Sequence, residues 1–443
     1  MGAFTGALRR SGDAGFSDAA LANIFNGRLP ARRPAAVLRA ADAADVAAGV
    51  KLAAAEGWQV SVRSGGHSWD AWSLREDALL IDLAALNGMR YSADTGIAAV
   101  GPAVRSGLDL DPFLATHDRF FAVGHHPTVS MGGFLLQGGM GWNCRGWGWA
   151  AESVASMDVV TASGEAVRCS ETENADLFWS ARGSGPGFFG VVTEFRLRTR
   201  PRHRSLTRST SVYPAELAAD VLTWFSSVRH EVDASVGLLA VGAAPSGLDS
   251  PVVIIDGISF DGGPSSLAPL ETCPVADRAL KSTVARPTDM GELFAEQSDG
   301  SPSGLRYFVD NAYVTGAASE LVPAVAPALA DLPTSETFTI LSDFSPQLSR
   351  DLPDMAVSLR PDLYFAAYVV SRGPADDARC RSWLDATMDR LAPFSEGCYL
   401  GDSDLTVRPD RILSDAAWSR LQRIRAARDP EGRFPGYLGT PVQ

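Results

Sequence analysis

The residues around His67 have the types and spacing of a loop that could bind a phosphate-containing ligand. His67 follows Ser64-Gly65-Gly66 at the end of an apolar segment, Trp58–Val62, that predicts a short strand. Two successive glycines let the backbone turn sharply and leave its N–H groups free to bind the oxygens of a phosphate or pyrophosphate. A histidine at this place would lie beside the bound group. The plain alternative is a tight surface turn with a solvated histidine.

A second glycine-dense segment, Gly124–Trp142, favours the first of these interpretations. It has the sequence GHHPTVSMGGFLLQGGMGW. Glycines at this density remove side chains from a wall where a flat ligand must approach the backbone. The two segments therefore predict one binding site with walls made largely of backbone.

Both segments resemble the FAD-linked oxidases of the vanillyl-alcohol oxidase superfamily, berberine-bridge-enzyme-like branch. The pattern GxxPTVxxGGxxxxGGxGW belongs to the flavin-binding loop of that family, and NADLFWSARGSG and FGVVTEF extend the resemblance over most of residues 34–200. The resemblance implies FAD bound covalently to His67 through the flavin 8α-methyl group. It implies cofactor contacts from Arg63, Ser64, Gly65, Gly66, His67, Ser68, Gly124, His126, Thr128, Val129, Gly132, Gly133, Gly138, Gly139, Gly141, Trp142, Gly190, Val191, Val192 and Tyr437.

The mode of attachment follows from the same resemblance. Doubly tethered members of the family have a cysteine at the position of His126, and this cysteine bonds flavin C6. Cys144 comes too late in the chain for that role and is interpreted as a buried structural thiol, so a single tether is expected. Val129 matches a position where a small residue leaves room for O₂. His117, His125 and His126 do not have the spacing of a metal site, and no metal is expected.

Oxidation of a C–H bond beside oxygen or nitrogen also needs a group that accepts a proton. The family often uses tyrosines of its substrate sheet and of a late YxN motif. Tyr399 occupies the late position, although the expected asparagine is Gly401. Tyr364 and Tyr368 lie four apart on a predicted strand and face the same way. We predict Tyr399 as the base and Tyr364 and Tyr368 as the next candidates. For each of them, ordinary packing is the alternative.

The other titratable groups offer fewer candidates. Most of the 52 acidic residues should be solvated, but Asp402 and Asp404 flank the late segment that should pass near the cofactor. His203 and His230 lie at a basic joint and at a helix end.

Gly185–Gly190 matches the GxGxxG pattern of nicotinamide cofactor sites. That fingerprint requires a helix after the glycines, with the pyrophosphate at the helix N-terminus. Here a strand, Val191–Arg198, is predicted instead, and Pro186 removes an amide. The segment is therefore interpreted as a glycine-rich turn, which the resemblance places near the adenosine of FAD.

The elements that must position these residues indicate an α+β fold. Strand, helix and strand follow one another over residues 34–63, with Asp42 and Gly57 as the caps of the helix. We expect a two-lobed FAD-binding domain of the PCMH type over 1–201 (core about 32–200). A substrate domain, with an antiparallel sheet covered by helices, should span 202–395. Residues 396–443 should return to the first domain.

Composition limits the partners. The net charge of −13 argues against nucleic acid and anionic membranes and favours a neutral or cationic substrate. No stretch has the roughly 20 apolar residues of a membrane span. Five scattered cysteines without CxxC and the lack of a signal peptide suggest the cytoplasm. We expect a monomer or homodimer.

Together these observations predict an FAD-dependent oxidase. Its substrate would be a small organic molecule, an alcohol, sugar or secondary metabolite, that gives a hydride to flavin N5. O₂ would then reoxidise the flavin and yield H₂O₂. The alternatives are a flavin dehydrogenase with another acceptor and a flavin- or small-molecule-binding protein without turnover.

Overall fold

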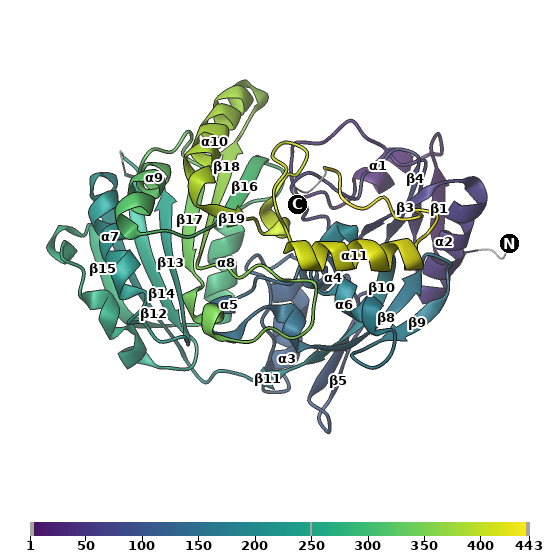
Figure 1. Ribbon diagram of the computed structural model, residues 1–443, viewed down its shortest axis with the longest axis horizontal. Coiled ribbons are helices and arrows are strands. Elements are labelled where there is room, and N and C mark those ends of the chain that lie inside the picture. Colours follow the sequence, from purple (N-terminus) through teal and green to yellow (C-terminus); the bar gives the residue numbers. More distant parts are fainter. Residues whose placement is uncertain (1–3, 249, 440–443) are drawn as a thin grey trace.

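Two lobes lie side by side in the computed structural model, which describes residues 4–248 and 250–439 (Figure 1). The first lobe contains two small sheets, with strand orders β1-β2-β4-β3 and β5-β6-β10-β8-β9, and a short pair, β11-β7. The second is built on one sheet with the order β15-β12-β14-β13-β17-β18-β16-β19. The architecture is α+β, as the sequence predicts.

The first lobe holds the N-terminal part of the chain and its last helix. Its strands are β1 (Ala7–Arg10), β2 (Ala36–Arg39), β3 (Gln59–Arg63), β4 (Ala78–Asp82), β5 (Met89–Ser92), β6 (Ile97–Val100), β7 (Arg119–Phe120), β8 (Val154–Thr161), β9 (Ala166–Cys169), β10 (Gly190–Arg198) and β11 (Arg200–Pro201). Its helices are α1 (Phe16–Leu21), α2 (Ala43–Glu56), α3 (Asp111–Ala115), α4 (Met131–Leu136), α5 (Cys144–Trp147), α6 (Ala175–Ala181) and α11 (Asp415–Arg428).

Helix α2 shows how the sequence sets the local structure that precedes His67. The Asp42 carboxylate accepts a hydrogen bond of 2.9 Å from the Asp45 N–H, and Gly57 ends the helix in the left-handed conformation at φ 72°. Strand β3 follows and pairs in parallel with β4. The glycine pair before His67 thus begins where a buried parallel strand ends.

The second lobe presents one face of its sheet to helices and the other to the first lobe. Its strands are β12 (Leu206–Pro214), β13 (Val236–Ala243), β14 (Val252–Ser259), β15 (Lys281–Thr288), β16 (Arg306–Val314), β17 (Phe338–Asp343), β18 (Leu363–Ser371) and β19 (Ser395–Gly397). Its helices are α7 (Ala218–Val228), α8 (Met290–Gly300), α9 (Ala318–Ala330) and α10 (Asp377–Leu391). Helices α7, α9 and α10 share an apolar core with the sheet. Helix α8 contributes Leu293 and Phe294 to the core of the first lobe instead.

The chain returns to the first lobe at its end. Helix α11, yellow in Figure 1, packs against α6 and adds Leu421 to the core of that lobe. The segment after it pairs with β3, because the Val60 N–H donates to the Arg433 carbonyl at 2.8 Å.

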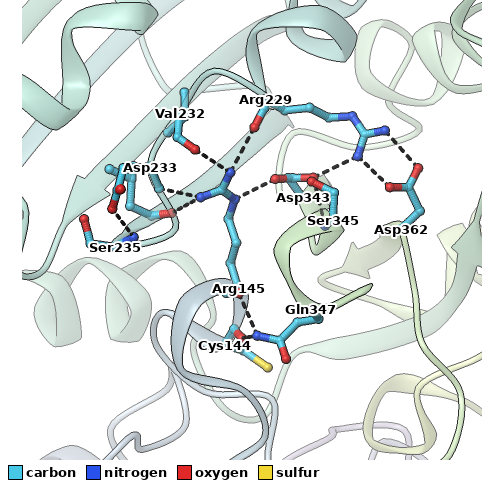
Figure 2. A network of polar contacts seen from close by, with 11 residues as sticks. Cys144, Arg145, Arg229, Val232, Asp233, Ser235, Asp343, Ser345, Gln347 and Asp362 are labelled. Atoms are coloured by element: carbon cyan, nitrogen blue, oxygen red, sulfur yellow. Dashed lines mark hydrogen bonds and ion pairs between the residues drawn. The ribbon is translucent and has the colours of Figure 1, made fainter. Parts of the chain in front are cut away.

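A buried network of charges joins the lobes (Figure 2). Arg145, on α5 directly after the glycine-dense loop, forms an ion pair of 2.6 Å with Asp343 at the end of β17. It also donates to carbonyl oxygens in the turn after α7. Arg229 pairs with both Asp343 and Asp362, and Gln347 donates to the Arg145 carbonyl. Because removing one partner of a buried pair costs about 3–5 kcal/mol, this network fixes the glycine-rich loop relative to the sheet.

Candidate active site

One cavity of about 710 Å³ lies between the lobes and is lined by both. The first lobe contributes the segment around His67, the loop that ends at Trp142, and Gly190–Val192. The second lobe contributes the helix-free face of its sheet and one side of α8. The cavity therefore has a wall made mostly of backbone and a wall made of side chains.

The backbone wall begins at Gly65 and Gly66. No backbone carbonyl within residues 4–248 and 250–439 accepts a hydrogen bond from the N–H of Gly65, Gly66 or His67. Gly66 has φ +77°, and a Cβ there would lie 1.9 Å from the Asn23 carbonyl oxygen. Three consecutive free amides at the edge of a cavity form the nest that suits a pyrophosphate.

The second glycine-dense segment supplies the adjoining wall. A Cβ on Gly133 would meet nothing within 4 Å, and one on Gly132 would lie 2.8 Å from Ser64 Oγ. Trp142 Nε1 and both polar atoms of the Asn143 amide are buried without a hydrogen-bond partner among the described residues. Buried polar groups normally have partners, so these atoms indicate a bound molecule with donors and acceptors of its own. Sequence reasoning found Trp142 but missed Asn143.

His67 is held in the neutral form at the edge of this wall. Its Nε2 lies 2.7 Å from Thr128 Oγ1, which in turn lies 2.9 Å from His126 Nδ1. Phe25 stacks on the His67 ring with centroids 4.4 Å apart. Burial, followed by the nearby His126, lowers the pKa of His67 to about 3. The ring therefore keeps a lone pair over the physiological pH range.

The side-chain wall carries one carboxylate with three donors. Asp402, on the short helical turn Leu400–Asp402, accepts hydrogen bonds from Tyr364 (2.6 Å), Tyr368 (2.9 Å) and Trp69 Nε1 (2.9 Å). Burial raises the pKa of Asp402 above its ordinary value, although the three donors counteract part of the rise. Burial and the Asp402 charge raise the pKa of both tyrosines, so they remain protonated.

Tyr399 lines the same cavity but is not bonded to this carboxylate. Its hydroxyl accepts a hydrogen bond of 3.3 Å from the Met140 N–H, and its backbone pairs with the Asn311 side chain. Burial, followed by the Asp402 charge, raises the pKa of Tyr399 far above its ordinary value. This phenol therefore stays protonated and cannot accept a proton, whereas the Asp402 carboxylate in the same cavity can do so when it is ionised.

Most of the other predicted contact residues line the cavity, and a few do not. Arg63, Ser64, Ser68, Gly124, Val129 and Gly141 are among the lining residues. Thr128, Gly138, Gly139 and Tyr437 are not among the lining residues, and the Tyr437 hydroxyl donates to the Ser184 carbonyl at 2.8 Å.

Two further sequence interpretations concern neighbouring segments. The GxGxxG segment is followed by strand β10 and not by a helix, which confirms that it lacks the nicotinamide-binding geometry. Cys144 is buried, and burial raises the pKa of its thiol, which disfavours the thiolate that a second attachment would need.

Within residues 4–248 and 250–439, no group of three His, Cys, Asp or Glu side chains could hold a metal ion. Of the helices in these ranges, none is both long and apolar enough to cross a membrane.

Comparison with known proteins gives a consistent result. Residues 34–170 match the FAD binding domain family. FAD-linked oxidoreductase ptmO of Penicillium ochrochloron is 32% identical over 430 residues, which cover 96% of this chain and 95% of that protein. The fold matches 6-hydroxy-D-nicotine oxidase from Arthrobacter nicotinovorans with a TM-score of 0.84 and 23% identity, covering 98% of this chain and 97% of the other. Xylooligosaccharide oxidase from Myceliophthora thermophila C1 gives 0.84 and 22%, with 99% and 98% covered.

Proposed function

The chain belongs to the FAD-linked oxidoreductases of the vanillyl-alcohol oxidase superfamily, berberine-bridge-enzyme-like branch, and from this premise we propose that it is an oxidase with FAD attached to His67. It would oxidise a C–H bond next to oxygen or nitrogen in a small organic substrate. The observation that carries the proposal is the single cavity that joins the amide nest and His67 to the Asp402 carboxylate.

The residues of the first lobe suit the cofactor. The amides of Gly65, Gly66 and His67 would hold the pyrophosphate, and Trp142 Nε1 and the Asn143 amide would find partners on the flavin side of the molecule. The neutral His67 imidazole is a competent nucleophile, and Thr128 and His126 hold its ring in place. Bound FAD would accept the hydride at N5 and return the electrons to O₂, giving H₂O₂.

The residues of the second lobe would handle the substrate proton. Asp402 is oriented by Tyr364, Tyr368 and Trp69, and each of these donates to it without bringing a positive charge. A substrate hydroxyl or amine that approaches this cluster can pass its proton to the carboxylate, directly or through a tyrosine hydroxyl.

One residue supports O₂ as the acceptor. Val129 lines the cavity opposite Gly124, where a Cβ would lie 3.2 Å from Val129 Cγ1. The small side chain of Val129 at this wall fits the family position that leaves room for O₂.

The first test of the proposal uses attachment and reoxidation. The purified protein should be yellow, and its colour should remain with the precipitate in acid. His67→Ala should release its flavin into the supernatant, while His230→Ala, an exposed histidine of the second lobe, should behave as wild type. Mixing the reduced protein with O₂ should restore the oxidised spectrum and form H₂O₂. Release of all wild-type flavin by acid would refute the tether, and failure to react with O₂ would refute the oxidase.

A further inference from the structure

The open face of the eight-stranded sheet carries a group of apolar side chains where it lines the cavity. Alternate residues of β13, β14 and β17 point into the cavity and away from the helices, because side chains alternate along a strand. These positions hold Val241, Ile254, Ile340, Phe338 and Leu239, and each is only half-buried. We call these five side chains the apolar floor.

The register of the strands places the floor in rows. Ile254 pairs with Val241, Val241 with Ile340, and Ile340 with Ala366, so one row across β14, β13, β17 and β18 is free of polar side chains. The neighbouring row starts at Tyr364 and runs through Ser342 and Leu239 to Asp256. The proton-accepting cluster therefore lies at one end of the floor.

Charged groups at the other end of the floor are already paired. Arg208 donates to Asp256 at 2.7 Å and to Glu296 at 2.6 Å, and Thr210 donates to the same Asp256 oxygen at 2.7 Å. Asp343, beside Ser342 at the end of β17, is neutralised by Arg145 and Arg229. An anionic ligand would find no unpaired cation among these groups, and the Asp402 carboxylate at the other end would repel it.

The spacing of strands gives the length of the floor. Tyr364 and Asp256 stand in one row, three strands apart, and neighbouring strands are about 4.8 Å apart, so the two residues are separated by about 14 Å. A molecule that reaches from Asp402 across the floor has about the length of several fused rings.

From these observations we infer that the substrate is an elongated and largely apolar molecule without negative charge, with its oxidisable hydroxyl or amino group at one end. This end meets Asp402, and the body covers the floor. The inference rests on the proposed function for the identity of the reacting end. It excludes oligosaccharides, because each hydroxyl buried against Val241 and Ile340 without a partner costs about 1–3 kcal/mol.

Calorimetric titration of the purified holoprotein tests the inference without relying on turnover. The probes are androsterone, a rigid fused-ring alcohol; cyclohexanol, which has the same reacting group and a single ring; and xylobiose. We expect androsterone to bind at least 10-fold more tightly than either of the others, because only androsterone covers the floor. Equal or tighter binding of cyclohexanol or xylobiose, or no binding of androsterone, would overturn the inference.

Substitutions in the apolar floor provide a second test of the inference. Val241→Asn and Ile340→Asn should each weaken androsterone binding about 10-fold, while Val407→Asn, at an exposed position outside the cavity, should leave it unchanged. Unchanged binding in both floor variants, with thermal melting showing them folded, would refute the role of the floor. If one of the two floor variants does not fold, androsterone binding by the other variant decides the test.

Loss of the oxidised flavin absorbance in the same samples reports reduction of the flavin. This measurement distinguishes a failure of the inference from a failure of the proposed function. Reduction by xylobiose and not by androsterone would support the oxidase and refute the apolar substrate. Tight, floor-dependent androsterone binding with a flavin that no alcohol or amine reduces would support the apolar site and count against the oxidase.

Discussion

The two walls of the cavity differ in the part of the chain that forms them. The cofactor wall is mostly backbone, with free amides at Gly65 and Gly66 and open space at Gly133. The substrate wall is made of side chains from five strands, from one side of α8 and from the turn that carries Asp402. A backbone wall tolerates few residue types because a Cβ would fill it, whereas a side-chain wall can change its chemistry without changing the fold.

The largest expected effect is on the substrate wall, at Asp402. Asp402→Asn should slow flavin reduction by about 10²-fold or more, the range for a lost general base, while the flavin stays bound. Asp404→Asn is the matched control. Asp404 is not among the residues that line the cavity, and its carboxylate accepts a hydrogen bond from the Thr406 N–H. Rapid mixing of the protein with substrate measures the rate. A wild-type rate in Asp402→Asn would remove Asp402 from the chemistry.

The pH dependence of the same rate sharpens this test. Asp402 can accept a proton only above its pKa, and burial raises that pKa, so flavin reduction should decline toward acid at a higher pH than a solvated aspartate would give. The decline should disappear in Asp402→Asn. An acid decline that persists in the variant would assign it to another group.

A smaller effect is expected on the cofactor wall, at Gly66. Gly66→Ala places a Cβ 1.9 Å from the Asn23 carbonyl oxygen and forces alanine to φ +77°, which costs about 1–2 kcal/mol before any clash. The flavin content after purification should fall about 10-fold. Gly88→Ala, where a Cβ would meet nothing within 4 Å, should keep full flavin content. Full occupancy in Gly66→Ala would show that the nest does not hold the cofactor.

The smallest effect is expected at Tyr399. Tyr399→Phe removes one neutral hydrogen bond, from the Met140 N–H, and should slow flavin reduction less than about 10-fold, since such a bond contributes about 1 kcal/mol. Tyr364→Phe should decrease the rate of flavin reduction more than Tyr399→Phe does, because the Tyr364 hydroxyl donates a hydrogen bond directly to Asp402. A 10²-fold loss in Tyr399→Phe would return the role of base to Tyr399, as its place in the sequence suggested.

Local signals predicted most of the first lobe. The caps Asp42 and Gly57 located α2, and the apolar segment before His67 located β3. The apolar run Phe120–Val123 is a strand only at Arg119–Phe120, because the Val123 carbonyl accepts a hydrogen bond from the Trp142 N–H in the glycine-dense loop. For the second lobe, the sequence indicated an antiparallel sheet covered by helices but not the order of its strands. Strand β13 contains Gly237 and Gly242, and its neighbour β17 follows only after β14, β15 and β16 in the chain.

The sequence by itself indicated the backbone wall, because two glycine-dense segments leave few side chains to fill it. It also placed a histidine at the end of the nest and tyrosines four apart on one strand. Only the tertiary structure decided that Asp402 accepts hydrogen bonds from those tyrosines and that an apolar floor crosses β14, β13 and β17. It also decided that the Asn143 side-chain amide has no partner among the described residues. Such contacts join residues that are distant in the chain, and the strand register that brings them together depends on packing of the whole sheet.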